Sequence, residues 1–137
     1  MGYKHILVAV DLAENNQPVI DKAVSLAKNL NAKLSFIYVD VSYLDVLAYE
    51  KKIPNQVNQE HQKFQTELEA LCEPINYPIS NKLVLGGRVE KQLLNTVKEM
   101  NIDLLISGHH HDLWNSWWSS AHKLLALTVV DLLLIRL

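Results

Sequence analysis

The sequence predicts an α/β protein in which a parallel β-sheet is covered by helices on both faces. Five short apolar segments, rich in Val, Ile and Leu, alternate with stretches whose apolar residues recur at helical spacing. A strand of a parallel sheet is buried on both faces, so such segments are almost continuously hydrophobic. Right-handed strand–helix–strand crossovers then align the strands in one sheet. We expect a single domain over residues 1–137, because neither a repeat nor a linker interrupts the pattern.

The first part of the chain predicts a strand, a helix and a second strand. The segment HILVAVD (residues 5–11) is the first strand, and Pro18 lies near the start of the helix. Asn31 is a suitable left-handed residue to end that helix. The segment KLSFIYVDV (residues 33–41) is the second strand. The apolar face of the helix carries Ile20, Ala23, Val24, Ala27 and Leu30.

The middle of the chain combines an irregular connection with a second helix. Residues 42–54 show no firm period, and we expect a connection there. A helical stripe follows, and Pro74 and Pro78 end it. His61 belongs to this stripe and is interpreted as a partly buried packing residue rather than a ligand. Cys72 is the only cysteine, which excludes an intrachain disulfide and predicts a buried, inert thiol. The stripe consists of Val57, His61, Phe64, Leu68 and Leu71.

The last part of the chain predicts three more strands, at residues 82–86, 103–108 and 131–137. A helix follows the first of them, and another lies near residues 119–128. The helix that follows residues 82–86 has an inward-facing apolar side, formed by Val89, Leu93, Leu94, Val97 and Met100. Sheets of this class bind ligands beyond the carboxyl ends of their strands, where the strand order switches. Asp11, the segment from Val39 to Val41, and Gly108 onward fall at those ends, so function is sought there.

The final strand indicates self-association. Leu132, Leu133, Leu134 and Ile135 are four consecutive apolar residues, so both faces of the strand need cover. If the strand lies at an edge of the sheet, its outer backbone groups also lack partners unless another chain supplies them. We therefore expect a homodimer that forms through this strand.

Composition excludes several classes of partner. The formal net charge is -2 and the 13 basic residues are scattered, so we expect no binding to nucleic acid. The apolar run at the amino terminus is too short for a signal peptide or a membrane span and ends at Asp11. The lone cysteine suits a reducing compartment. A cytoplasmic protein is the expectation.

The segment GHHHDLWNSWWSS (residues 108–120) carries most of the chemistry-bearing side chains. Three adjacent histidines cannot all point the same way, and no second pair of ligands occurs elsewhere, so we expect no native metal site. Serines occur nearby, but no nucleophile elbow surrounds them, and we expect no enzymatic reaction. Trp114, Trp117 and Trp118 either pack a helix onto the sheet or form a contact surface for a protein partner.

A glycine between a strand and a helix is typical of a phosphate-binding loop, because backbone amides at a helix start hold phosphate. Gly108 occupies such a place, yet it is the only glycine after Met100, whereas a working loop needs more than one.

The segments HILVAVDLAE, IYVDV and DLLISGHHHDLWNSWWSSAHKLL together resemble the universal stress protein family over essentially the whole chain. The last segment is most similar to the universal stress protein A subgroup of bacteria. The resemblance implies a Rossmann-like fold of the adenine nucleotide alpha hydrolase type, with five parallel strands in the order 3-2-1-4-5. It also implies dimers that form through the last strand.

In nucleotide-binding members of the family, the fourth strand precedes Gly, two residues, Gly, nine residues, and then Gly with Ser or Thr. In this chain the first glycine is Gly108, the second falls on His111, and the final pair falls on Ala121 and His122. A histidine side chain stands where a phosphate needs bare backbone. The resemblance therefore implies a stress protein that does not bind ATP, has no cofactor and acts through partner proteins that the sequence does not identify.

The alternative is a nucleotide-dependent switch or weak ATPase with a modified loop. Asp11 and Val39 match the positions at which the family contacts the base, and Gly108 would line the same side. His109 and His111 would replace the glycine amides as phosphate donors. Because histidine must be protonated for this role, binding would strengthen as the pH falls through about 6.5.

Overall fold

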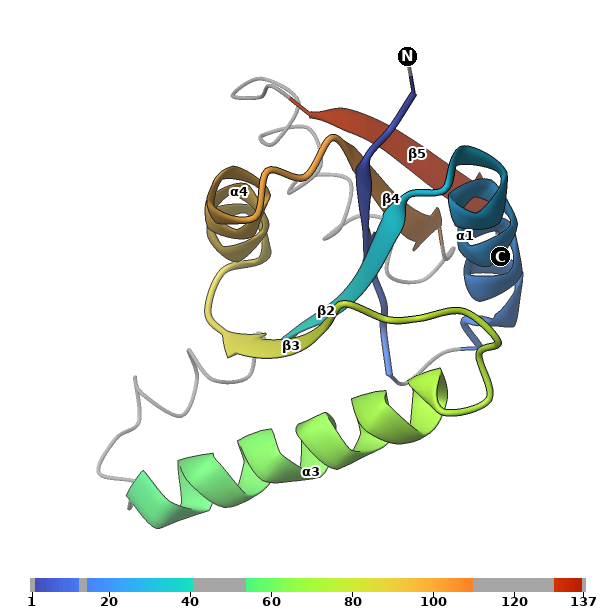
Figure 1. Ribbon diagram of the computed structural model, residues 1–137. Coiled ribbons are helices and arrows are strands. Elements are labelled where there is room, and N and C mark those ends of the chain that lie inside the picture. Colours follow the sequence, from blue (N-terminus) through green and yellow to red (C-terminus); the bar gives the residue numbers. More distant parts are fainter. Residues whose placement is uncertain (1, 13–14, 41–53, 110–129, 137) are drawn as a thin grey trace.

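The computed structural model describes residues 2–12, 15–40, 54–109 and 130–136, and its elements surround a single sheet (Figure 1). Three helices and five strands lie within these residues. In chain order they are β1 (His5–Ala9), α1 (Gln17–Leu30), β2 (Lys33–Asp40), α3 (Pro54–Cys72), β3 (Asn81–Gly86), α4 (Val89–Glu99), β4 (Leu104–His109) and β5 (Asp131–Arg136).

The five strands form one parallel sheet in the order β3-β2-β1-β4-β5, which confirms the predicted topology. Strands β1 and β4 are neighbours at the centre, and the chain leaves them toward opposite edges of the sheet. The switch in strand order therefore lies between β1 and β4. In the sheet itself, β3 and β5 are the two edge strands.

Helix α1 follows its predicted boundaries closely. Pro18 lies in the first turn, where its missing amide hydrogen costs no helical hydrogen bond. Asn31 ends the helix in the left-handed conformation (φ 53°, ψ 43°) and donates its amide hydrogen to carbonyls of the last turn. The Tyr77 hydroxyl donates to the carbonyl oxygen of Ala32 at 2.5 Å, and the carbonyl oxygen of Ala27 lies 3.3 Å from the same hydroxyl. The end of α1 is thus fixed by both its own stop residue and a distant tyrosine.

Two apolar cores flank the sheet. Residues of α1 and α3 pack on one face around Phe36, whereas α4 packs on the other face around Ile37. In Figure 1, α1 and α4 lie on opposite sides of the strands. Phe36 and Ile37 are both fully buried because successive residues of β2 point to opposite faces. This arrangement explains the continuous apolar pattern of the strand.

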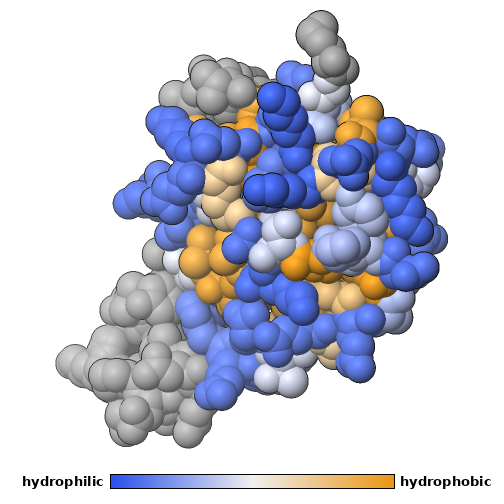
Figure 2. Space-filling model, in the orientation of Figure 1, coloured by the Kyte–Doolittle hydropathy of each residue, from blue (hydrophilic) through white to orange (hydrophobic). Residues whose placement is uncertain are grey.

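The outer surface is mainly hydrophilic in the view of Figure 2, with apolar residues visible between α4 and β3. Cys72 is buried, as predicted, and His61 is partly buried, which also agrees with its interpretation as a packing residue. Among the helices of the described ranges, none has the length and hydropathy needed to cross a bilayer.

Some predicted boundaries are corrected. The first strand ends at Ala9 rather than Asp11, and the second helix already begins at Pro54. Asp103 precedes β4 instead of belonging to it, since its carboxylate accepts the amide hydrogens of Lys4 (2.8 Å) and His5 (3.0 Å). The predicted helix at 119–128, the three tryptophans and most of the 42–54 connection lie outside the described residues.

Candidate functional site

The register of the sheet brings three predicted site residues to one level at its carboxyl edge. Ala9 of β1 pairs with Ile37 of β2 and with Ser107 of β4. Asp11 follows the end of β1 by two residues, Val39 lies two residues after Ile37 in β2, and His109 ends β4, so all three lie at the carboxyl edge beside the switch point. Gly108 lies one residue before His109, on the β4 side. His111, the remaining predicted residue, is outside the described part of the chain.

Asn16 holds the turn that follows β1. Its side chain is 5% exposed, and its Nδ2 donates to the Asp11 carbonyl oxygen at 2.7 Å. The Asp11 amide donates in return to Asn16 Oδ1 at 3.3 Å. The side chain of Asn16 therefore supplies hydrogen bonds of the kind that a further strand residue would have made. This pair fixes the Asp11 backbone at the switch point and explains why β1 ends early.

Gly87 shapes the adjoining turn between β3 and α4. Its φ of +133° suits glycine, and its amide donates to the Asp40 carbonyl at 3.2 Å. The Gln92 side chain donates to the Gly86 carbonyl at 3.1 Å, which ties the first turns of α4 to the strand end. The carboxyl ends of β2 and β3 are thus joined through the backbone of this turn.

Tyr38 brings a phenol to the same edge on the face covered by α1 and α3. Its ring packs on Phe64 of α3, with the ring centroids 5.0 Å apart and the planes tilted by 52°. Burial is the main cause that raises the pKa of Tyr38 to about 12, and the charges of Asp40, Asp11 and Glu67 add to it. The phenol therefore stays protonated at neutral pH.

Val39 contributes packing at the strand end. It is half-buried, pairs with Leu85 of β3 and contacts the core beneath α4. Asp11 is likewise half-buried, and the carboxyl group of Asp40 is buried. The carboxyl edge therefore combines fixed backbone groups with acidic and phenolic side chains.

The structure places the predicted residues Asp11, Val39 and Gly108 at the carboxyl edge, whereas sequence reasoning did not single out Asn16 and Tyr38 there. Asn16 precedes a proline-containing helix start, where asparagine is a common cap, and this was an available signal. Its side chain instead bonds to Asp11, five positions earlier, which depends on the tertiary position of the turn. Tyr38 sits within an apolar strand, and nothing in its spacing distinguishes it from a core residue.

The predicted dimer strand β5 has the expected edge position. Leu133 is 39% exposed, Leu132 and Leu134 are half-buried, and Ile135 is buried at 4% exposed. The outermost strand thus presents an apolar side chain to solvent at its middle. Tyr3 donates a hydrogen bond to the Asp131 carboxylate at 2.7 Å, where β5 begins.

A shallow groove lies elsewhere, between α1 and the segment that follows α3. Its volume is about 420 Å³, and none of its lining residues is a predicted site residue. Ile20, Val24, Leu71 and Ile75 supply the apolar part of the lining. The groove is therefore separate from the switch point of the sheet.

Comparisons with known proteins agree with this geometry. Residues 2–136 match the Universal stress protein family. The Universal stress protein A of Photorhabdus laumondii is 40% identical over 141 residues, an alignment that covers 100% of this chain and 97% of that protein.

Solved structures give the same fold. A universal stress protein from Lactobacillus plantarum superposes with a TM-score of 0.69 at 18% identity, over 99% of both chains. A family member from Arabidopsis thaliana, solved with AMP bound, superposes with a TM-score of 0.60 at 13% identity, over 97% of this chain and 91% of that one. With the strand order, the near-complete family match and full-length relatives in agreement, the chain belongs to the universal stress protein family.

Proposed function

We propose that this chain acts in stress resistance and growth arrest as a cytoplasmic homodimer that binds partner proteins and carries out no reaction of its own. The family match supports a role in the stress response, and the exposed Leu133 on edge strand β5 carries the homodimer. An edge strand with an apolar outward residue is an aggregation hazard unless a specific partner covers it. A second copy of the same strand would extend the sheet and bury both copies of this leucine.

The absence of an ATP requirement is the second part of the proposal. His111 and Ala121 stand where nucleotide-binding members carry glycine, and His122 stands where they carry Ser or Thr. Side chains at these positions would occupy the space that phosphate oxygens need near the backbone amides. We therefore expect partner proteins, rather than a nucleotide, to be what the chain binds.

The dimer is tested by Leu133→Lys, with Leu30→Lys as the matched control. In the described part of the chain, Leu30 is the other large apolar residue with an exposed side chain, at 37%. It is the last residue of α1 and does not lie on β5. Fully burying a leucine is worth about 1.5–3 kcal/mol, and Leu133 is 39% exposed, so the dimer gains about 0.6–1.2 kcal/mol from each copy. Symmetry removes two copies at once, so the dimer Kd should rise about tenfold or more. Light scattering across a concentration series measures the change.

Both the wild type and Leu30→Lys should be dimers at concentrations where Leu133→Lys is a monomer. A monomeric wild type at micromolar concentration contradicts the dimer proposal. Dissociation of both variants to the same extent would place the interface elsewhere.

A nucleotide-dependent function is the second candidate. The placement of Asp11, Val39 and Gly108 near the carboxyl ends of β1, β2 and β4 favours it, and the Arabidopsis thaliana relative was solved with AMP bound. Denaturing the purified protein and measuring absorbance of the released solute at 260 nm detects nucleotide that was carried through purification. Calorimetric titration with ATP and with AMP at millimolar concentration then measures the affinity. No released nucleotide and no heat would refute this candidate, whereas saturable heat would overturn the ATP-independent proposal.

A further inference from the structure

A chain of polar side chains crosses three strands at the amino edge of the sheet, opposite the candidate site. His5 Nε2 of β1 lies 2.7 Å from Ser35 Oγ of β2, and Ser35 Oγ lies 3.3 Å from Asn81 Oδ1 of β3. Ser35 is fully buried, His5 is half-buried and Asn81 is exposed. This series of polar side chains therefore runs from the interior of the sheet to its β3 edge.

The other nitrogen of the His5 ring determines how protons are arranged. His5 Nδ1 lies 3.3 Å from the carbonyl oxygen of Met100, the residue that caps the end of α4. A carbonyl oxygen accepts hydrogen bonds and donates none, so Nδ1 must carry a hydrogen. The protonation of His5 consequently depends on whether Nε2 carries a hydrogen as well.

Each state of Nε2 requires a different direction for the Ser35 hydroxyl. When His5 is neutral, Nε2 accepts the Ser35 hydroxyl hydrogen, and the Ser35 oxygen is left to accept from the Asn81 amide nitrogen. When His5 is charged, Nε2 donates to the Ser35 oxygen, and the hydroxyl hydrogen points to Asn81 Oδ1. Serine has a single hydroxyl hydrogen, so it cannot serve both neighbours at once. Asn81 Oδ1 lies 3.3 Å from Ser35 Oγ, close enough for the amide at the end of this hydrogen-bonded series to respond to the direction of the hydroxyl.

We propose that His5, Ser35 and Asn81 form a proton-responsive relay in which protonation of His5 reverses the Ser35 hydroxyl and rotates the Asn81 side-chain amide by a half-turn. The rotation exchanges the amide oxygen and nitrogen that face Ser35. Asn81 begins the edge strand β3, and its neighbour Lys82 accepts a hydrogen bond through its carbonyl from Gln65 of α3 at 3.2 Å. A protonation event in the sheet thereby changes a polar group at the junction of β3 and α3.

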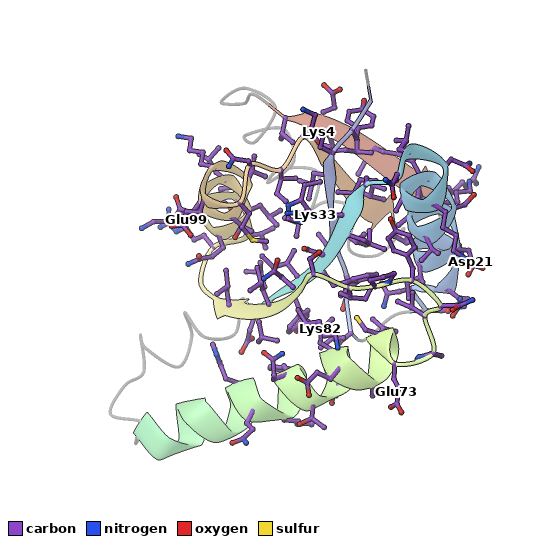
Figure 3. The ribbon with its side chains drawn as sticks, in the orientation of Figure 1. Lys4, Asp21, Lys33, Glu73, Lys82 and Glu99 are labelled. Atoms are coloured by element: carbon purple, nitrogen blue, oxygen red, sulfur yellow. The ribbon has the colours of Figure 1, made fainter. Side chains whose placement is uncertain are left out.

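The surroundings of His5 decide the pH range of the relay. Burial is the largest effect and lowers the pKa of His5 below its ordinary value of 6.5. The positive charge of Lys33 on β2 lowers it further, while the Met100 carbonyl of α4 and the negative charge of Asp103 before β4 raise it. From β3 the neighbouring group is the uncharged amide of Asn81. Figure 3 shows Lys33 near the amino end of β2. The relay therefore operates on the acidic side of neutrality.

The test is an NMR titration of the full-length protein from about pH 7.5 to about pH 4.5, a range that spans the ordinary histidine pKa. The His5 ring carbon–hydrogen signal reports protonation, and the Asn81 side-chain amide signals report rotation. Both should inflect at the same midpoint, below pH 6.5. The exposed Asn29 amide on α1 serves as an internal reference and should not inflect at that midpoint.

Ser35→Ala removes the hydroxyl and leaves His5 and Asn81 unchanged. In this variant His5 should still titrate, and the Asn81 inflection should disappear. His5→Gln is the second variant, because a buried change at Ser35 can also impair folding, and it should likewise abolish the Asn81 inflection. An Asn81 amide that does not shift while His5 titrates in the wild type overturns the relay. So does an Asn81 inflection that persists in either variant, or a His5 ring that stays neutral throughout.

Discussion

Replacing Asn16 by alanine tests whether one buried side chain fixes the turn at the switch point. Asn16→Ala removes the donor to the Asp11 carbonyl (2.7 Å) and the acceptor of the Asp11 amide hydrogen (3.3 Å). A typical hydrogen bond contributes about 1 kcal/mol net, and leaving a buried backbone group without its partner costs about 1–3 kcal/mol. With the site 5% exposed, water has little access to compensate. We expect a loss of about 2–3 kcal/mol in the free energy of unfolding.

Urea denaturation followed by far-ultraviolet circular dichroism measures this loss as a lower midpoint at an unchanged m-value. Asn29→Ala is the matched control, because Asn29 is an exposed asparagine on α1, the helix that Asn16 precedes, and alanine favours helices. The control should change stability by no more than about 0.5 kcal/mol. A loss below about 0.5 kcal/mol in Asn16→Ala would refute the view that this side chain organises the turn.

Three further outcomes follow from other described groups. Gly87→Ala should destabilise the fold by about 1–3 kcal/mol in the same assay, because φ is +133° and an added Cβ would lie 3.0 Å from Gln92 Nε2; an unchanged midpoint would contradict the strain. Burial raises the pKa of Cys72 from 9.0 to about 11, which lowers its thiolate fraction about a hundredfold. Iodoacetamide at pH 8 should therefore modify the native protein at least about a hundredfold more slowly than the urea-unfolded chain, as followed by mass spectrometry, and comparable rates would show an accessible thiol. The pKa of His5 is lowered in the folded state, so the unfolded chain binds more protons and stability should fall as the pH drops below about 6.5. His5→Gln should weaken that pH dependence. If the variant and the wild type show the same pH profile of the unfolding free energy, His5 is not the cause of the dependence.

The sequence was sufficient for the order and class of the described elements, because each depends on a local pattern. The strands are continuously apolar since they are covered on both faces, and the end of α1 is encoded by Asn31, which tolerates a left-handed backbone. The position of β5 at the sheet edge came from family resemblance, and the sheet order confirms it.

The details that position the site were not predictable in the same way. Asn16 bonds backward to Asp11, and the Asp103 carboxylate bonds to the amides of Lys4 and His5 across the sheet. Both interactions join residues that the fold brings together, and no periodicity records them. The early end of β1 and the late start of β4 follow from these contacts rather than from strand propensity.

Asp11 and Val39 match the positions at which the family contacts the base, but this match does not distinguish the partner-binding function from the nucleotide-dependent function. Val39 packs against the core beneath α4, and the Asp11 backbone is held by Asn16, so the fold has uses for both without a nucleotide. A base-binding role would require the same backbone geometry, which is why these positions satisfy either reading. What differs between the readings is the phosphate side of the site, where His111 and Ala121 replace glycine. Titrations with AMP and ATP address that side directly, because the two ligands share the base and the ribose and differ in phosphate number. Binding of AMP without any gain from the added phosphates of ATP would locate the loss of function in the loop and leave the edge formed by Asp11 and Val39 competent.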